Sequence, residues 1–148
     1  MQSSAVQHSQ RGLWLMVLVV ALTGCLGSSE PFDYVEVTGK VTYEDGSIIP
    51  ADNITVTFVP QLESVDETIY PPSGMADVNV ADGTFDTVTS RNYGDGIVPG
   101  KHKVLVQAFI GEMEPSTAIP AIYADPATTP LEIDTSDTKP LKLLIARP

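Results

Sequence analysis

The side chains best suited to nucleophilic, acid–base or soft-metal chemistry are few in this chain and far apart. The only cysteine is Cys25, and the two histidines are His8 and His102. A Ser-His-Asp triad would use His102 as its base, but no Gly-x-Ser-x-Gly sequence supplies the serine of a nucleophile elbow. A zinc site needs several Cys or His ligands together. We therefore expect no enzyme activity, with His102 packed in a strand.

Calcium is the one metal for which the oxygen-rich turns contain suitable ligands. Asp82, Asp86 and Asp95 supply carboxylates, which are the ligands that calcium prefers. Two of them precede glycine, however, and Asp-Gly pairs are also typical of tight turns. No twelve-residue loop of the helix–loop–helix type is present. We expect no metal and no cofactor, while calcium binding by the acidic loops stays open.

Three tyrosines are the candidates for ligand contact. Tyr70, Tyr93 and Tyr123 lie in or beside predicted loops, the longest of which cover residues 60–74 and 111–130. Exposed aromatic rings of this kind form platforms for glycans or peptides. The alternative is that each ring packs inward and closes one end of the domain.

An apolar run over residues 12–22 precedes these candidates and ends in Leu22-Thr23-Gly24-Cys25. A bilayer core needs roughly 20 apolar residues, so this run is too short to span it, and it suits the apolar core of a secretory signal. Leu22-Thr23-Gly24-Cys25 resembles the bacterial lipobox. The resemblance implies removal of residues 1–24, acylation of Cys25 and attachment to a membrane. The alternative is an ordinary signal peptide with a chance cysteine.

The rest of the chain divides into a short tether and one domain. Residues 25–33 are rich in Gly and Ser, and such a segment reaches roughly 16 Å; residues 34–148 form a domain of ordinary size. The formal net charge of the full chain is −11, and loss of Arg11 with the leader makes it more negative. A body this acidic repels nucleic acid. Leu26, in place of the Asp that retains such proteins in an inner membrane, favours the outer membrane of the cell envelope.

The domain alternates apolar and polar residues with a period of two, which predicts strands. Gly39 occupies an inward position without a side chain, which indicates a bulge or the close approach of another strand. Phe85 and Val88 are both apolar but three apart, which indicates a second bulge. The predicted strands cover residues 34–44, 54–59, 76–80, 84–89, 102–109, 131–134 and 141–145. We expect an all-β, seven-stranded antiparallel Greek-key β-sandwich.

Several segments match one pattern in the same order. They are Val37-Thr38-Gly39-Lys40-Val41-Thr42-Tyr43, Ala81-Asp82-Gly83-Thr84-Phe85, Val98-Pro99-Gly100 with Val104, and Tyr123-Ala124-Asp125-Pro126. Together they resemble the bacterial lipoproteins built on a carboxypeptidase regulatory-like, transthyretin-like domain, over about residues 35–145. The resemblance implies a seven-stranded sandwich without catalysis. The loop at residues 46–50 and the acidic 60–74 loop depart from the family, which leaves the ligand open. The related hydroxyisourate hydrolases need several histidines and a carboxy-terminal Tyr-Arg-Gly-Ser, which this chain lacks.

The sequence therefore predicts a non-enzymatic, lipid-anchored β-sandwich of the cell envelope that acts as a structural or interaction module. Its predicted partners are the membrane, through Cys25, and an envelope protein or glycan. The alternative is a surface module that binds glycan or peptide through the 60–74 and 111–130 loops. A hydrolase that depends on His102 is a third hypothesis.

Overall fold

The computed structural model describes residues 31–65, 68–111, 114–136 and 140–148. The apolar run, the lipobox-like segment with Cys25 and most of the predicted tether lie outside these residues. Within the described ranges, no helix has the length and apolar character needed to cross a bilayer.

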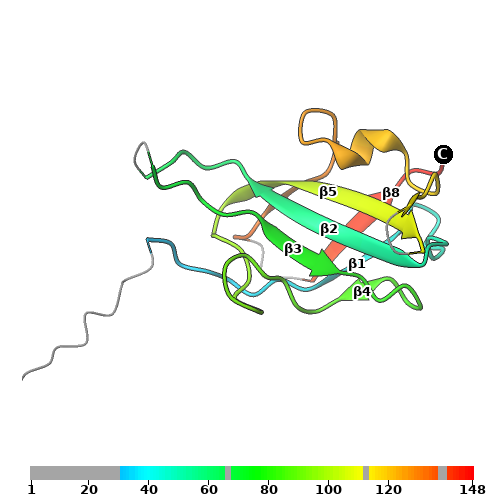
Figure 1. The fold of residues 1–148 in the computed structure, drawn as a ribbon, viewed down its shortest axis with the longest axis horizontal. Helices are drawn as coiled ribbons and strands as arrows, with labels where there is room; N and C mark the ends of the chain where they lie inside the picture. The colour runs from blue at the N-terminus through cyan, green and yellow to red at the C-terminus, as the bar shows by residue number, and fades with distance from the viewer. Residues whose placement is uncertain (1–30, 66–67, 112–113, 137–139) are drawn as a thin grey trace, which may run out of the picture.

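The domain consists of two β-sheets packed face to face (Figure 1). One sheet has the order β4-β1-β8, with β4 at Thr84–Phe85, β1 at Gly39–Tyr43 and β8 at Leu141–Ile145. The other has the order β3-β2-β5-β6, with β7 also paired to β5. Its strands are β3 (Gly74–Asp77), β2 (Asn53–Pro60), β5 (Lys101–Ile110), β6 (Glu114–Pro115) and β7 (Glu132–Asp134). A short 3-10 helix, η1 (Ala121–Ala124), lies beside β5.

The antiparallel pair of β2 and β5 is the longest ladder, running from Asn53↔Phe109 to Pro60↔His102. Alternate side chains of both strands are buried, as the two-residue period predicts. They contact the buried side chains of the three-stranded sheet and form one core between the sheets. The inward residues of the two strands are Ile54, Val56, Phe58, His102, Val104, Val106 and Ala108.

The prediction that all strands are antiparallel is wrong at one pair. β1 and β8 are parallel, with Gly39 opposite Leu141 and Tyr43 opposite Ile145. Parallel neighbours need a crossover connection rather than a hairpin. Here the crossover includes all five strands of the larger sheet, which lie between β1 and β8 in the sequence. The chain then returns to the smaller sheet, where β8 runs parallel to β1.

The predicted strand over residues 84–89 divides between the two sheets. Phe85 pairs with Gly39 in the smaller sheet, whereas Thr89 forms an isolated bridge with Met75 at the edge of the larger one. Phe85 and Val88 are both buried. The loss of alternation between them thus marks the point where the chain passes from one sheet to the other, and not a bulge within a strand. The strand predicted over residues 34–44 is also shorter, because Val35 pairs only with Ile97.

Gly39 confirms the predicted close approach of another strand. A Cβ atom placed on it would lie 2.7 Å from the Leu141 carbonyl oxygen and 2.7 Å from Cζ of Phe85. Real Cβ atoms do not come so near. The absence of a side chain at this position therefore lets β1 pair with β8 while Phe85 packs over it.

We expect Gly39→Ala to destabilise the domain by roughly 1–3 kcal/mol, because the added methyl group overpacks the junction of β1, β4 and β8. The free energy of unfolding from denaturant titration measures this. Lys40→Ala, at the exposed neighbouring position, is the control and should change stability by less than about 0.5 kcal/mol. Equal stability of Gly39→Ala and the unchanged protein would contradict the packing described here.

Candidate functional site

The three tyrosines predicted as ligand contacts have different environments. Tyr70 is 65% exposed and Tyr93 is 90% exposed, so both are accessible on the surface. Tyr123 lies in η1 and is only 3% exposed, and its hydroxyl oxygen accepts a hydrogen bond of 2.9 Å from the Ala146 N–H. Tyr123 therefore fastens η1 to the segment after β8, which matches the alternative of a ring that packs inward.

The three aspartates considered for calcium accept hydrogen bonds from nearby residues of their own segments. Asp82 accepts hydrogen bonds from the N–H and the hydroxyl of Thr84 at 2.9 and 2.7 Å, which lower the pKa of its carboxyl. Asp86 accepts one from the Thr87 hydroxyl. Among the described residues, no three His, Cys, Asp or Glu side chains come together as a metal site would require.

Asp95 organises the turn that carries Tyr93. Its carboxylate accepts main-chain N–H groups at 2.7–3.0 Å from Ser90, Arg91 and Asn92. Partial burial raises the pKa of Asp95, but these N–H bonds outweigh it, so the pKa falls below its ordinary value. The turn thus uses this carboxylate as a cap, in place of the metal ligand considered from the sequence.

His102 lies in β5 as predicted and is completely buried. Its Nδ1 is 3.1 Å from the Gly100 carbonyl oxygen, which can only accept, so Nδ1 carries the proton. Nε2 has no hydrogen-bond partner. Burial lowers the pKa of His102, although the Gly100 carbonyl and Asp134 act in the opposite direction. The side chain is therefore a neutral part of the packing at neutral pH.

The cavity beside His102 has no serine or cysteine in its lining. It measures about 410 Å³ and is lined by Gln61, Lys101, His102, Glu132, Ile133 and Asp134. A hydrolase with a histidine base needs a serine or cysteine within hydrogen-bond reach, and no such side chain is part of this lining. The geometry gives no support to the hypothesis of a hydrolase that depends on His102.

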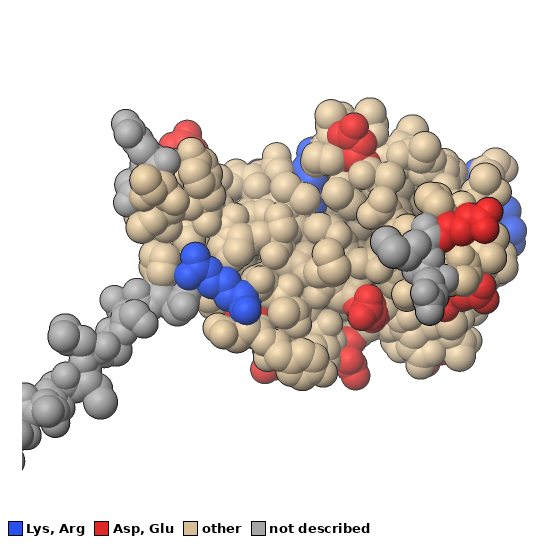
Figure 2. Space-filling view, in the orientation of Figure 1, with Lys and Arg blue, Asp and Glu red and all other residues tan. Residues whose placement is uncertain are grey.

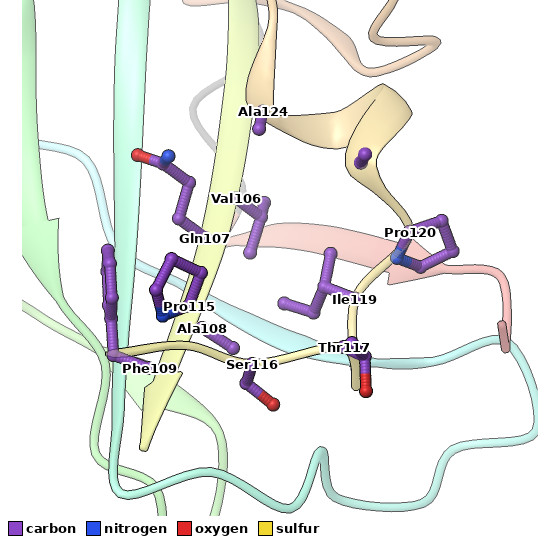
Figure 3. Close-up of a pocket in the computed structure, with 11 residues that line it drawn as sticks. Val106, Gln107, Ala108, Phe109, Pro115, Ser116, Thr117, Ile119, Pro120 and Ala124 are labelled. Atoms are coloured by element: carbon purple, nitrogen blue, oxygen red, sulfur yellow. The ribbon is translucent and has the colours of Figure 1, made fainter. Parts of the chain in front are cut away.

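A second pocket, of about 340 Å³, lies between β5 and residues 115–124, a part of the predicted 111–130 loop that includes η1 (Figure 3). Its lining is mainly aliphatic or proline, and no charged side chain takes part. Val106 and Ile119 approach each other at its centre, with Pro115 and Ala124 on either side (Figure 3). This pocket suits an apolar group and has no residue for acid–base chemistry.

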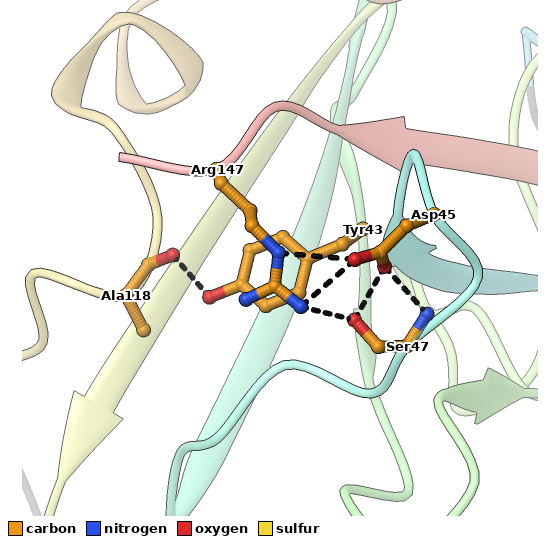
Figure 4. A network of polar contacts seen from close by, with 5 residues as sticks. All are labelled: Tyr43, Asp45, Ser47, Ala118 and Arg147. Atoms are coloured by element: carbon orange, nitrogen blue, oxygen red, sulfur yellow. Dashed lines mark hydrogen bonds and ion pairs between the residues drawn. The ribbon is translucent and has the colours of Figure 1, made fainter.

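A cluster of polar contacts holds the segment beside this pocket in place (Figure 4). The Arg147 guanidinium stacks on Tyr43, 4.3 Å from the ring centroid, and donates to Asp45 and Ser47 at 2.7–3.1 Å. The Tyr43 hydroxyl donates to the Ala118 carbonyl at 2.8 Å. These bonds tie residue 147 to the turn after β1 and to residues 115–124.

The hydroxyl and N–H of Ser47, followed by Arg147, lower the pKa of Asp45 to about 2. The carboxylate is therefore charged at neutral pH. Sequence analysis missed this cluster, because Asp45 and Arg147 are 102 positions apart and no local pattern joins them.

The charged side chains form no continuous patch on the face shown in Figure 2. The charged residues are scattered over this face in small groups, with uncharged areas between the groups (Figure 2). No protein-family model, curated protein or solved structure matches this chain. The structure shows a small all-β protein with two sheets.

We expect Tyr123→Ala to destabilise the domain by roughly 3–5 kcal/mol, because it empties a buried site. Tyr123→Phe should cost about 1 kcal/mol through the lost hydrogen bond to Ala146. The matched control is Tyr93→Ala at the most exposed tyrosine, which should leave stability within about 0.5 kcal/mol. Thermal or denaturant unfolding measures all three, and an unchanged Tyr123→Ala would contradict its burial.

The buried neutral His102 also predicts a pH dependence. Because its pKa in the folded domain lies below the ordinary 6.5, the unfolded chain binds the proton first as the pH falls. Stability should therefore decrease from about pH 6.5 downward. Chemical unfolding at pH 7 and pH 5 should show the loss, and His102→Phe should abolish it within this window. A flat profile in the unchanged protein would contradict the assignment.

Proposed function

We propose that this chain is a lipid-anchored, non-enzymatic interaction domain of the bacterial cell envelope. The observation that carries the proposal is Leu22-Thr23-Gly24-Cys25 at the end of the apolar run. Acylation of Cys25 with two or three chains would hold the protein on a membrane almost permanently. Leu26 after the cysteine supports the outer membrane.

The finer family assignment belongs to the same proposal. A carboxypeptidase regulatory-like, transthyretin-like lipoprotein would carry one sandwich domain behind a short tether. The two-sheet body and the strand alternation support it. The parallel pairing of β1 with β8 departs from the all-antiparallel arrangement expected from the resemblance.

The non-enzymatic character is supported by the chemistry of the two cavities. The pocket between β5 and residues 115–124 has no titratable side chain in its lining. The cavity beside His102 has no serine or cysteine in its lining, and its histidine is neutral and completely buried. An apolar pocket with a few neutral polar groups is a binding feature.

The pocket also has a suitable position for a domain anchored at its amino end. The first described residues lie at the same end as the 60–74 loop, and Val35 is bonded there to Ile97 (Figure 1). β5 runs from this end to the other and spans roughly 33 Å. The pocket lies along its second half, so an anchored domain would present it to the envelope space and not to the bilayer.

The anchor is tested by the intact mass of the protein purified from the membranes of a bacterium that processes lipoproteins. We expect a chain that starts at Cys25 and carries acyl groups. The control is Cys25→Ser, which should be neither acylated nor cleaved at this position. An unmodified chain in the soluble fraction would overturn the anchor and the proposed location.

The alternative of a ligand-binding surface module also has an observation in its favour. Of the two loops considered, the segment over residues 115–124 forms an apolar pocket. The tyrosine of this segment, Tyr123, is buried and cannot serve as a stacking platform for a sugar. For this pocket, peptide is therefore a better candidate ligand than glycan.

A further inference from the structure

The outer edge of β5, away from β2, is paired at both of its ends but not in the middle. β7 pairs with residues 101–103 and β6 pairs with residues 109–110. The pocket between β5 and residues 115–124 lies against the interval between these two short strands.

Val106 occupies this interval. In an antiparallel ladder, the N–H and C=O groups of alternate residues point to the same edge. The Val104 N–H donates outward to Leu131 at 2.9 Å, and the Ala108 carbonyl accepts outward from Ser116 at 2.8 Å. The main-chain N–H and C=O of Val106 therefore point outward as well, between these two bonds.

These two groups have no partner among the hydrogen bonds of the described residues. Val106 is also 0% exposed, so bulk water does not replace the missing partner. Buried main-chain groups are nearly always paired, and leaving them unpaired is costly. The middle of this edge thus has one unpaired N–H donor and one unpaired C=O acceptor, both on Val106.

The pocket above Val106 suits a segment of extended peptide, which has apolar side chains as well as main-chain N–H and C=O groups. Its lining combines aliphatic and proline side chains with three neutral polar ones, from Gln107, Ser116 and Thr117. It would accept an apolar side chain while the main chain of the same segment meets Val106. A lipid chain would fill the volume but would leave both main-chain groups unpaired.

We propose that this pocket binds an extended peptide segment of a partner protein, which adds to β5 as a short strand at Val106. The proposal rests on the proposed function as an interaction module. The segment donates one N–H to the Val106 carbonyl, accepts the Val106 N–H, and places an apolar side chain beside Ile119. Since Val106 is covered in the free domain, residues 115–124 move outward as the segment enters.

The test uses a fluorescent pentapeptide with valine and threonine at alternate positions, capped at both ends, and the same peptide N-methylated at its central valine. The protein is the full chain as recovered from bacteria, in lipid nanodiscs if acylated and in buffer if not. The binding result is then independent of the anchor. Fluorescence anisotropy measures affinity, and hydrogen exchange measures protection of the Val106 amide.

We expect the unmodified peptide to slow exchange at Val106, and N-methylation to weaken binding by roughly fivefold or more, as the loss of main-chain bonds implies. Equal affinity of the two peptides would show capture of side chains alone and would overturn the strand pairing. Absence of binding at millimolar peptide, or unchanged exchange at Val106, would also overturn it.

Two alanines give matched variants for the same measurement. Ala124 is exposed and lines the pocket, whereas Ala127 is exposed and lies outside its lining. Ala124→Trp should fill the pocket and weaken binding by roughly tenfold, while Ala127→Trp should leave it within about twofold. Equal effects of the two variants, with both domains folded by circular dichroism, would contradict the site.

Discussion

The burial of one face of β2 and β5 against the three-stranded sheet is the interaction on which the rest of the structure depends. Neither sheet is stable alone, because each has one apolar face that water would otherwise contact. Phe58 of β2 and Phe85 of β4 meet across the interface, with ring centroids 6.0 Å apart. The loops and turns that carry the candidate sites are positioned only because this interface fixes the two sheets relative to each other.

This dependence explains why the polar side chains of the domain serve structure more than chemistry. Asp82 and Asp95 close turns that return the chain to one sheet or the other. Arg147 and Tyr43 join segments from both sheets around residues 115–124. The features available for recognition are the pocket beside β5 and the main-chain groups of β5 at Val106.

Local patterns were enough to predict β2 and β5, because the alternation of Ile54, Val56 and Phe58 is visible in the sequence and each lies in the core. The packing role of Gly39 and the burial of His102 followed from the same alternation. The parallel pairing of β8, the change of sheet after Phe85 and the contact of Asp45 with Arg147 did not follow. Each depends on which distant segment lies opposite, and a period of two contains no information on direction or partner.

In the candidate site as well, local patterns predicted some features, whereas others depend on contacts with distant segments. The 111–130 segment was expected to be a loop, yet it contains β6 and η1. The sequence left Tyr123 open between an exposed platform and a ring that packs inward; in the structure the ring is buried and its hydroxyl bonds to Ala146. A tyrosine near prolines has the same local sequence whether it points outward or inward. The lipobox-like segment lies outside the described residues, so the prediction for Cys25 stays a prediction.

The parallel pairing of β1 with β8 has a consequence for the order in which the domain is completed. Among the described strands, β1 comes first along the chain and its partner β8 comes last. β4 pairs with only Gly39 and Lys40 of β1. Until residues 141–145 are available, β1 is an open edge and the core lacks Leu143 and Ile145. Contacts between residues so far apart are late and slow to form. The smaller sheet of a partly synthesised chain therefore stays incomplete until residues 141–145 are available.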